Sequence, residues 1–215
     1  MAELVPIPSP GTPLYYGAPG SPLIVVAHDW YGRLPWLDAY ADALAAQGFR
    51  VVVPDFYRGV ATIDTESAAG LRDALDPEEA LAIIDDLVAE GRLEGSERIG
   101  LIGFSMGGWI SLLHAQGGDA DAVVAYYATL GLEEHGIIPC PVLLHLAESD
   151  GWNPGAEPES FVARLEDHGT PVTQFSYLGT EHSFANANIA ATVNTRAAAL
   201  AFARTASFLD RHLSE

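Results

Sequence analysis

The pattern with the clearest chemical meaning in this sequence is Gly103-Phe104-Ser105-Met106-Gly107. It matches G-x-S-x-G, in which a serine sits on a sharp turn between a strand and a helix with its hydroxyl exposed. Glycine is needed two residues before and two residues after the serine because side chains there would collide. The apolar run RIGLI precedes the motif and MGGWISLLHA follows it, as a strand–turn–helix requires. A glycine-rich turn that only packs a helix against a strand is the alternative explanation.

A serine hydroxyl is a weak nucleophile and needs a base, which in turn needs an acid to fix its tautomer. Of the seven histidines, His182 is the best candidate because it follows a predicted strand and precedes the final predicted helix. His145 lies within the apolar run VLLHL, which is typical of a core histidine. Asp150 also follows a predicted strand and is the expected acid; Glu148 is the alternative acid, and an ordinary turn aspartate is the alternative role for Asp150.

Backbone amides complete the predicted site. The N–H of Met106 and the N–H of Trp30, in the loop after the run LIVVA, are expected to form an oxyanion hole. The chain order Ser105, Asp150, His182 is the Ser–Asp–His order of α/β-hydrolases. Three loops that each follow a strand, in this order, are far more specific than the glycine–serine motif alone.

The elements that must position these residues alternate along the chain. Short apolar runs predict strands at residues 23–27, 50–53, 98–102, 122–127, 142–146 and 172–177. Helical spacing of apolar residues predicts helices between them, one of which begins at Asp76-Pro77 with a capping aspartate and a first-turn proline. This alternation predicts an α/β fold with a doubly wound, mostly parallel sheet, whose ligands collect at the carboxyl ends of the strands.

Domain organisation follows from length and proline content. The 215 residues are enough for one domain, at 23–215, preceded by a proline-rich lead-in at 1–22 that is extended, with at most a short edge strand. Only residues 128–141 separate two of the strands, which is too short for the inserted cap domain of many α/β-hydrolases. Residues 58–76 are the expected mobile rim of the site.

Composition excludes several functions. The net charge of −19 disfavours nucleic-acid and membrane-surface partners. All ten cationic side chains are arginines, so Schiff-base and P-loop lysines are excluded. The single cysteine, Cys140, excludes a multi-cysteine metal site and is expected to be a buried structural thiol. The start MAELVPIPSP lacks the layout of a secretory signal, so a cytoplasmic location is expected.

The chain resembles the dienelactone hydrolase family from about Leu23 to the final helix. The resemblance rests on the segments LIVVAHDWYG, VVVPDFYRG, RIGLIGFSMGG, AVVAYYA, LAESD and LGTEHSFA. It implies a compact α/β-hydrolase that opens cyclic or linear esters, with Ser105 as nucleophile, His182 as base and Asp150 as acid. Met106 and Trp30 match the oxyanion-hole positions of the family.

Three departures from the family pattern affect the expected substrate. Well-known members carry cysteine where this chain has Ser105, and glutamate where it has Asp29, which could instead pair with Arg33 or Arg58 or cap a turn. The family grips a substrate carboxylate with two arginines; Arg58 matches one, whereas Asn186 stands at the position of the other. A neutral or mono-anionic ester or lactone is therefore expected.

The sequence thus predicts a serine hydrolase for small carboxylic esters or lactones that needs no cofactor and no metal. Expected substrate-binding residues, beside the motif loops, are Asp29, Arg58, Phe104, Trp152 and Phe184. Use of the same triad by a thioesterase or acyltransferase is one alternative, and a non-catalytic ligand-binding α/β-hydrolase domain is another. The sequence leaves the oligomeric state open, and a monomer is compatible with it.

Overall fold

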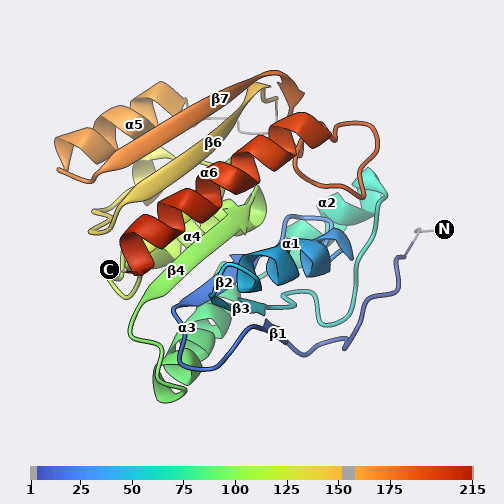
Figure 1. Ribbon diagram of the computed structural model, residues 1–215. Coiled ribbons are helices and arrows are strands. Elements are labelled where there is room, and N and C mark those ends of the chain that lie inside the picture. The colour runs from blue at the N-terminus through green and yellow to red at the C-terminus, as the bar shows by residue number, and fades with distance from the viewer. Residues whose placement is uncertain (1–3, 152–157, 215) are drawn as a thin grey trace.

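The chain is built around a mixed β-sheet, and the computed structural model describes residues 4–151 and 158–214. Within these residues the sheet has seven strands in the order β1-β3-β2-β4-β5-β6-β7 (Figure 1). The strands are β1 (Leu14–Tyr16), β2 (Leu23–Ala27), β3 (Arg50–Val53), β4 (Ile99–Phe104), β5 (Ala122–Tyr126), β6 (Val142–Ser149) and β7 (Val172–Glu181). The helices are α1 (Trp36–Ala45), α2 (Thr65–Ala74), α3 (Pro77–Leu93), α4 (Met106–Ala115), α5 (Pro158–Asp167) and α6 (Thr195–Leu213).

The pairing of the strands confirms the predicted α/β fold. Strands β2 to β7 are joined to their neighbours in parallel, and β1 alone among the described strands pairs antiparallel, along β3. Strand β1 lies within residues 1–22, where the sequence predicts extended chain with at most a short edge strand. Every residue of β2, β3, β4 and β5 is buried. Their mostly apolar sequences follow from this, because both faces of the sheet are covered.

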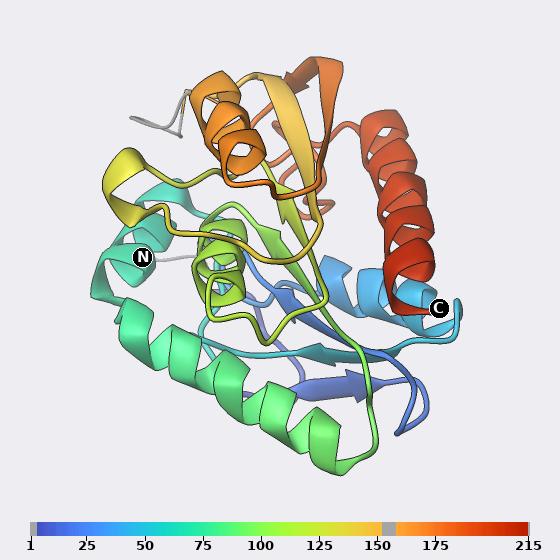
Figure 2. The same cartoon turned by 90° about the vertical axis from the view of Figure 1, so that its left-hand side faces the viewer.

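Helices form a layer on each side of the sheet. Figure 2 shows α1 and α6 on one face and α3, α4 and α5 on the other. Helix α3 begins as predicted, with the Asp76 carboxylate accepting a hydrogen bond from the Glu78 N–H and with Pro77 in the first turn. No helix of the described residues is both long and apolar enough to cross a membrane.

Two strands run further than their apolar residues indicate. Strand β6 continues to Ser149 and β7 to Glu181, whereas the apolar runs end at residues 146 and 177. The ladder continues past an irregularity, so that Ser149 is still paired with Glu181. Backbone hydrogen bonding does not require apolar side chains, and this is why the sequence pattern missed these ends. The consequence is that Asp150 and His182 each directly follow the last residue of a strand.

The two segments beside the predicted site contain one short helix and one 3₁₀ turn. The expected rim at residues 58–76 contains helix α2, whose N-terminus is capped by the Asp64 carboxylate. Between β5 and β6, residues 127–141 hold only the short 3₁₀ turn η1 (Leu132–Glu134). The described chain therefore has no cap domain at this point, as its length predicts.

A buried polar chain crosses the core behind β6. The side chain of His145 is fully buried and lies 2.7 Å, through Nδ1, from the Tyr177 hydroxyl and 2.9 Å, through Nε2, from Thr205 Oγ1. Thr205 Oγ1 also lies 2.8 Å from the Tyr126 hydroxyl, so the network joins β5, β6 and β7 to α6. His145 is a core histidine, as predicted. Burial lowers its pKa to about 3.

This burial predicts a pH dependence of stability. A histidine whose pKa is lowered on folding stabilises the native state above pH 6.5, and the stabilisation is lost as the pH falls toward 3. Between pH 7 and pH 5 the His145 contribution falls by about 2 kcal/mol. Urea unfolding of wild type and His145→Gln at both pH values measures it, and we expect the pH-dependent loss to be smaller in the variant by that amount. Equal losses in the two proteins would show that His145 is not the group responsible.

Candidate active site

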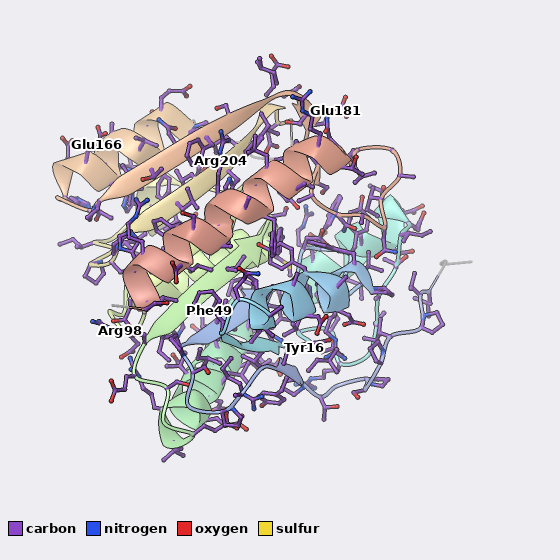
Figure 3. The ribbon with its side chains drawn as sticks, viewed as in Figure 1. Tyr16, Phe49, Arg98, Glu166, Glu181 and Arg204 are labelled. Atoms are coloured by element: carbon purple, nitrogen blue, oxygen red, sulfur yellow. The ribbon has the colours of Figure 1, made fainter. Side chains whose placement is uncertain are left out.

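The side chains of Ser105, His182 and Asp150 meet at the carboxyl edge of the sheet. Ser105 Oγ lies 2.7 Å from His182 Nε2. His182 Nδ1 lies 2.8 and 2.9 Å from the two carboxylate oxygens of Asp150. In Figure 3, Glu181 marks this edge at the end of β7, whereas Phe49 and Arg98, which precede β3 and β4, lie at the opposite edge. Three loops far apart in sequence are therefore brought together as parallel strands require.

The serine occupies a strained turn that the flanking glycines make possible. Ser105 has φ 52° and ψ −116°, a conformation that residues with a side chain rarely adopt. A Cβ on Gly103 would lie 2.1 Å from the Gly107 carbonyl oxygen. A Cβ on Gly107 would lie 2.4 Å from the carbonyl oxygens of Ala27 and His28. These positions accept only glycine because backbone approaches backbone at both.

Backbone hydrogen bonds anchor this turn on both sides. The Ser105 N–H donates to the Tyr126 carbonyl at 2.9 Å, and the Ser105 carbonyl accepts from the Trp109 N–H at 2.9 Å. The first bond ties the turn to strand β5 and the second begins helix α4. The hydroxyl is thereby held at the N-terminus of a helix, where the macrodipole favours developing negative charge.

The imidazole is almost enclosed. His182 is 8% exposed, and the ring of Tyr127 lies 4.9 Å from it, centroid to centroid. The Asp150 carboxylate can only accept, so the Nδ1–H of a neutral His182 donates to it and Nε2 is left to accept the Ser105 proton. The geometry therefore places a base on the serine and an acceptor behind the base, which is the arrangement that activates a hydroxyl nucleophile.

A pocket of about 330 Å³ opens over the serine. Its walls are mostly apolar and include Trp30, Met106 and Trp109. The remaining lining residues are Arg72, Leu75, Pro77, Ser105, Tyr127, Ala128, Thr129 and His182. Trp30 and Met106, the two expected amide donors, thus border the same pocket as the Ser105 hydroxyl. Among the described residues that line it, Arg72 is the one permanent cation.

Arg72, not Arg58, brings positive charge to this pocket. The Arg58 side chain, expected to bind substrate, is 75% exposed, forms an ion pair with Glu79 on α3 and is not among the residues that line the pocket. Arg72 lies on α2, 5.5 Å from the Trp30 ring, with its guanidinium also donating to Asp73. The sequence analysis expected a rim at residues 58–76 but did not predict α2 within it, and it gave no signal that Arg72 faces the pocket.

The expected aromatic walls lie deeper than predicted. Phe104 is fully buried and packs edge-on against Trp36 in the core, because it is the last residue of a central strand. Phe184 is also fully buried, with its ring 5.4 Å from that of Tyr127. Neither residue is among those that line the pocket. Trp152 lies outside the described residues.

Asp29 is buried and pairs with neither of the arginines considered for it. Its carboxylate accepts hydrogen bonds from the Tyr31 N–H at 3.0 Å and from Asn186 Nδ2 at 2.8 Å. Arg33 instead donates to backbone carbonyls, including those of Ser9 and Thr12. Burial raises the pKa of Asp29 to about 6. Capping a turn, one of the alternatives considered for Asp29, is thus combined with a contact to Asn186 that sequence reasoning missed. Asp29 was also expected to bind substrate, but it is buried and is not among the residues that line the pocket.

The described residues contain no group of three or more His, Cys, Asp or Glu side chains placed to hold a metal ion. Cys140 is a buried free thiol, and burial raises its pKa to about 12. The Cys140 thiol is therefore protonated at neutral pH and is a structural residue, not a thiolate nucleophile.

The close backbone contacts of the turn predict a strong effect of one methyl group. Gly103→Ala should lower the free energy of unfolding by about 2–3 kcal/mol or more, because the Gly107 carbonyl that the new Cβ meets is backbone and cannot rotate away. Gly70→Ala is the matched control: a Cβ there meets nothing within 4 Å, and in the middle of α2 it should stabilise by up to about 1 kcal/mol. Urea unfolding measures both, and equal effects would contradict the crowding argument.

Comparison with known proteins agrees with the fold. A relative from Azospirillum brasilense is 32% identical over 214 residues, covering 92% of this chain and 90% of its own. The carboxymethylenebutenolidase of Pseudomonas putida is 29% identical over 206 residues, covering 88% of this chain and 85% of its own. The solved structure of the dienelactone hydrolase-like promiscuous phosphotriesterase P91, from metagenomic libraries, superposes with a TM-score of 0.75 at 18% identity, covering 93% of this chain and 92% of its own. The model of the dienelactone hydrolase family matches residues 14–213, and the chain belongs to that family.

Proposed function

We propose that this protein is a serine hydrolase that cleaves small carboxylic esters or lactones through an acyl-enzyme. The observation that carries the proposal is the contact of Ser105 Oγ with His182 Nε2 at 2.7 Å, with Asp150 bonded to the other ring nitrogen. Family membership supports the reaction class, and the curated relative from Pseudomonas putida is named as a lactone-opening enzyme, a carboxymethylenebutenolidase.

The proposed reaction begins with attack of Ser105 Oγ on the ester carbonyl carbon. His182 takes the hydroxyl proton as the C–O bond forms, and Asp150 stabilises the imidazolium. The carbonyl oxygen becomes an oxyanion that the N–H groups of Met106 and Trp30 bind. His182 then gives the proton to the leaving alkoxide oxygen, which departs as an alcohol or, for a lactone, stays attached to the acyl group.

Release of the product repeats these steps with water. His182 removes a proton from a water molecule that attacks the acyl-enzyme, and returns it to Ser105 Oγ when the tetrahedral intermediate collapses. The products are a carboxylic acid and the regenerated serine. Because the attacking atom is a serine hydroxyl oxygen, His182 must remove its proton during the attack. A cysteine could already be deprotonated, as a thiolate, before the attack.

The pocket argues for a small substrate. Its volume of about 330 Å³ is at the low end of the roughly 300–1,000 Å³ typical of ligand sites. The apolar walls suit a short aliphatic or aromatic group beside the reacting ester. Arg72 adds one positive charge, so a mono-anionic ester or lactone fits this pocket as well as a neutral one.

Hydrolysis of p-nitrophenyl acetate by wild type and Ser105→Ala, purified side by side, tests the proposed function. We expect the variant to lose at least about a thousandfold in kcat while its thermal unfolding is unchanged, because the remaining site has no nucleophile. Equal turnover by the two proteins would contradict the proposal.

The charge of the pocket predicts a separate effect on specificity. Arg72→Gln should lower kcat/KM about tenfold for an ester with a carboxylate in its acyl group, and change it less than about threefold for a neutral ester of equal size. Arg58→Gln is the matched control and should alter neither, because Arg58 lies outside the pocket lining. Measurement of kcat/KM for both esters with each variant tests this prediction. A lower kcat/KM for the anionic ester with Arg58→Gln but not with Arg72→Gln would show that Arg72 is not the residue that binds the carboxylate.

A further inference from the structure

Directly behind the proposed catalytic residues lies a buried polar pair that the reaction does not use. Asp29 is 1% exposed and Asn186 is 0% exposed, and the Asn186 side-chain amide donates to Asp29 Oδ2 at 2.8 Å. The two residues are 157 positions apart in the chain. Burying a carboxylate and an amide is costly unless each is hydrogen-bonded, so a pair of this kind calls for a reason.

On one side the pair shapes the turn that carries Trp30. Asp29 Oδ1 accepts from the Tyr31 N–H at 3.0 Å, and the Asp29 carbonyl accepts from the Gly32 N–H at 3.1 Å. These two bonds close a turn in which Trp30 is the first central residue. The direction of the Trp30 N–H therefore depends on where the Asp29 carboxylate is held.

A histidine fixes the start of the same turn. His28 Nδ1 lies 2.7 Å from the Asp29 carbonyl oxygen, and His28 Nε2 accepts from the Phe56 N–H at 3.1 Å. His28 Nδ1 therefore carries the proton and donates it in a hydrogen bond to the backbone carbonyl of Asp29. Burial lowers the pKa of His28 to about 4, so the ring is neutral, as this pair of bonds requires.

On the other side the pair belongs to the loop that carries His182. The Asn186 N–H donates to the Ser183 carbonyl at 2.9 Å, and Asn186 Oδ1 accepts from the Asn188 N–H at 2.9 Å. Asn188 Oδ1 in turn accepts from the N–H of Trp36, at the start of α1. The amide of Asn186 is thus oriented by its own loop, with its NH₂ group directed at Asp29.

We propose that Asp29 and Asn186 are a pair of positioning residues, which lock the Trp30 turn to the His182 loop and so hold the oxyanion-binding amide in register with the Ser105–His182–Asp150 triad. The inference rests on the proposed function and extends it to two residues that touch no substrate. The hydrogen bond has a direction: the side chain at position 29 accepts and the side chain at position 186 donates. The contact is kept only if this acceptor and this donor stay in place or are exchanged together.

Single substitutions reverse only one half of this contact. Asp29→Asn places an NH₂ group against the NH₂ group of Asn186, and Asn186→Asp places a second buried carboxylate against Asp29. We expect each to lower kcat for p-nitrophenyl acetate by about 10²-fold, since displacement or loss of an oxyanion donor costs about that much. KM should change less than about threefold, because ground-state binding in the apolar pocket is not altered.

The double variant Asp29→Asn/Asn186→Asp restores every bond with the charge moved. The amide oxygen at position 29 accepts from Tyr31, its NH₂ donates to the new carboxylate, and that carboxylate still accepts from Asn188. We expect kcat to return to within about fivefold of wild type. The affinity of a trifluoromethyl ketone, which forms a tetrahedral adduct with the serine, should fall in both single variants and recover in the double variant in parallel with kcat.

Two comparisons separate this inference from general damage and from the proposed function. Asn194→Ala removes another asparagine side-chain hydrogen bond from the same segment, to the Ala197 N–H that begins α6, and should lower the melting temperature without changing trifluoromethyl ketone affinity. Ser105→Ala reports whether turnover depends on the serine at all. If turnover is serine-dependent and folded single variants keep kcat within threefold, or the folded double variant fails to recover, the positioning role is wrong.

Discussion

The site depends on one steric constraint, the contact of backbone with backbone at Gly103 and Gly107. Because no side chain intervenes, the chain can leave β4, turn at a strained serine and enter α4 within three residues. The strain is held by the burial of both elements and by the Ser105–Tyr126 backbone bond. The same close approach brings the Ala27–His28 backbone against Gly107, so the turn also fixes where the loop carrying Trp30 begins.

Much of the fold could be predicted from sequence because a sheet buried on both faces leaves a strong signal. The runs of β2 and β5 are apolar throughout, β3 is apolar after Arg50, and the start of α3 is encoded in Asp76 and Pro77. The last residues of β6 and β7 could not be predicted because they are held by backbone pairing and carry exposed, mostly polar side chains. Local patterns report burial, and most residues of these strand ends are exposed, Thr180 being a buried exception.

The same distinction explains which site residues were foreseen. Ser105, Asp150 and His182 follow strands in a recognisable order, so their meeting follows from topology. Arg58 matches a family position but pairs with Glu79 outside the pocket lining, whereas Arg72 lines the pocket because of how α2 packs. Likewise, the bond between Asp29 and Asn186 has no local signal, since it joins two loops through side chains that each look like ordinary turn residues.

We infer that this turn presents Ser105 as a nucleophile activated by His182. Peptide mapping by mass spectrometry after reaction with a fluorophosphonate tests it most directly. We expect one phosphonyl group per chain, located on Ser105, with the rate of labelling at least about a hundredfold lower in His182→Ala. Labelling at another residue, or labelling of Ser105 at an equal rate in the folded His182→Ala protein, would contradict it.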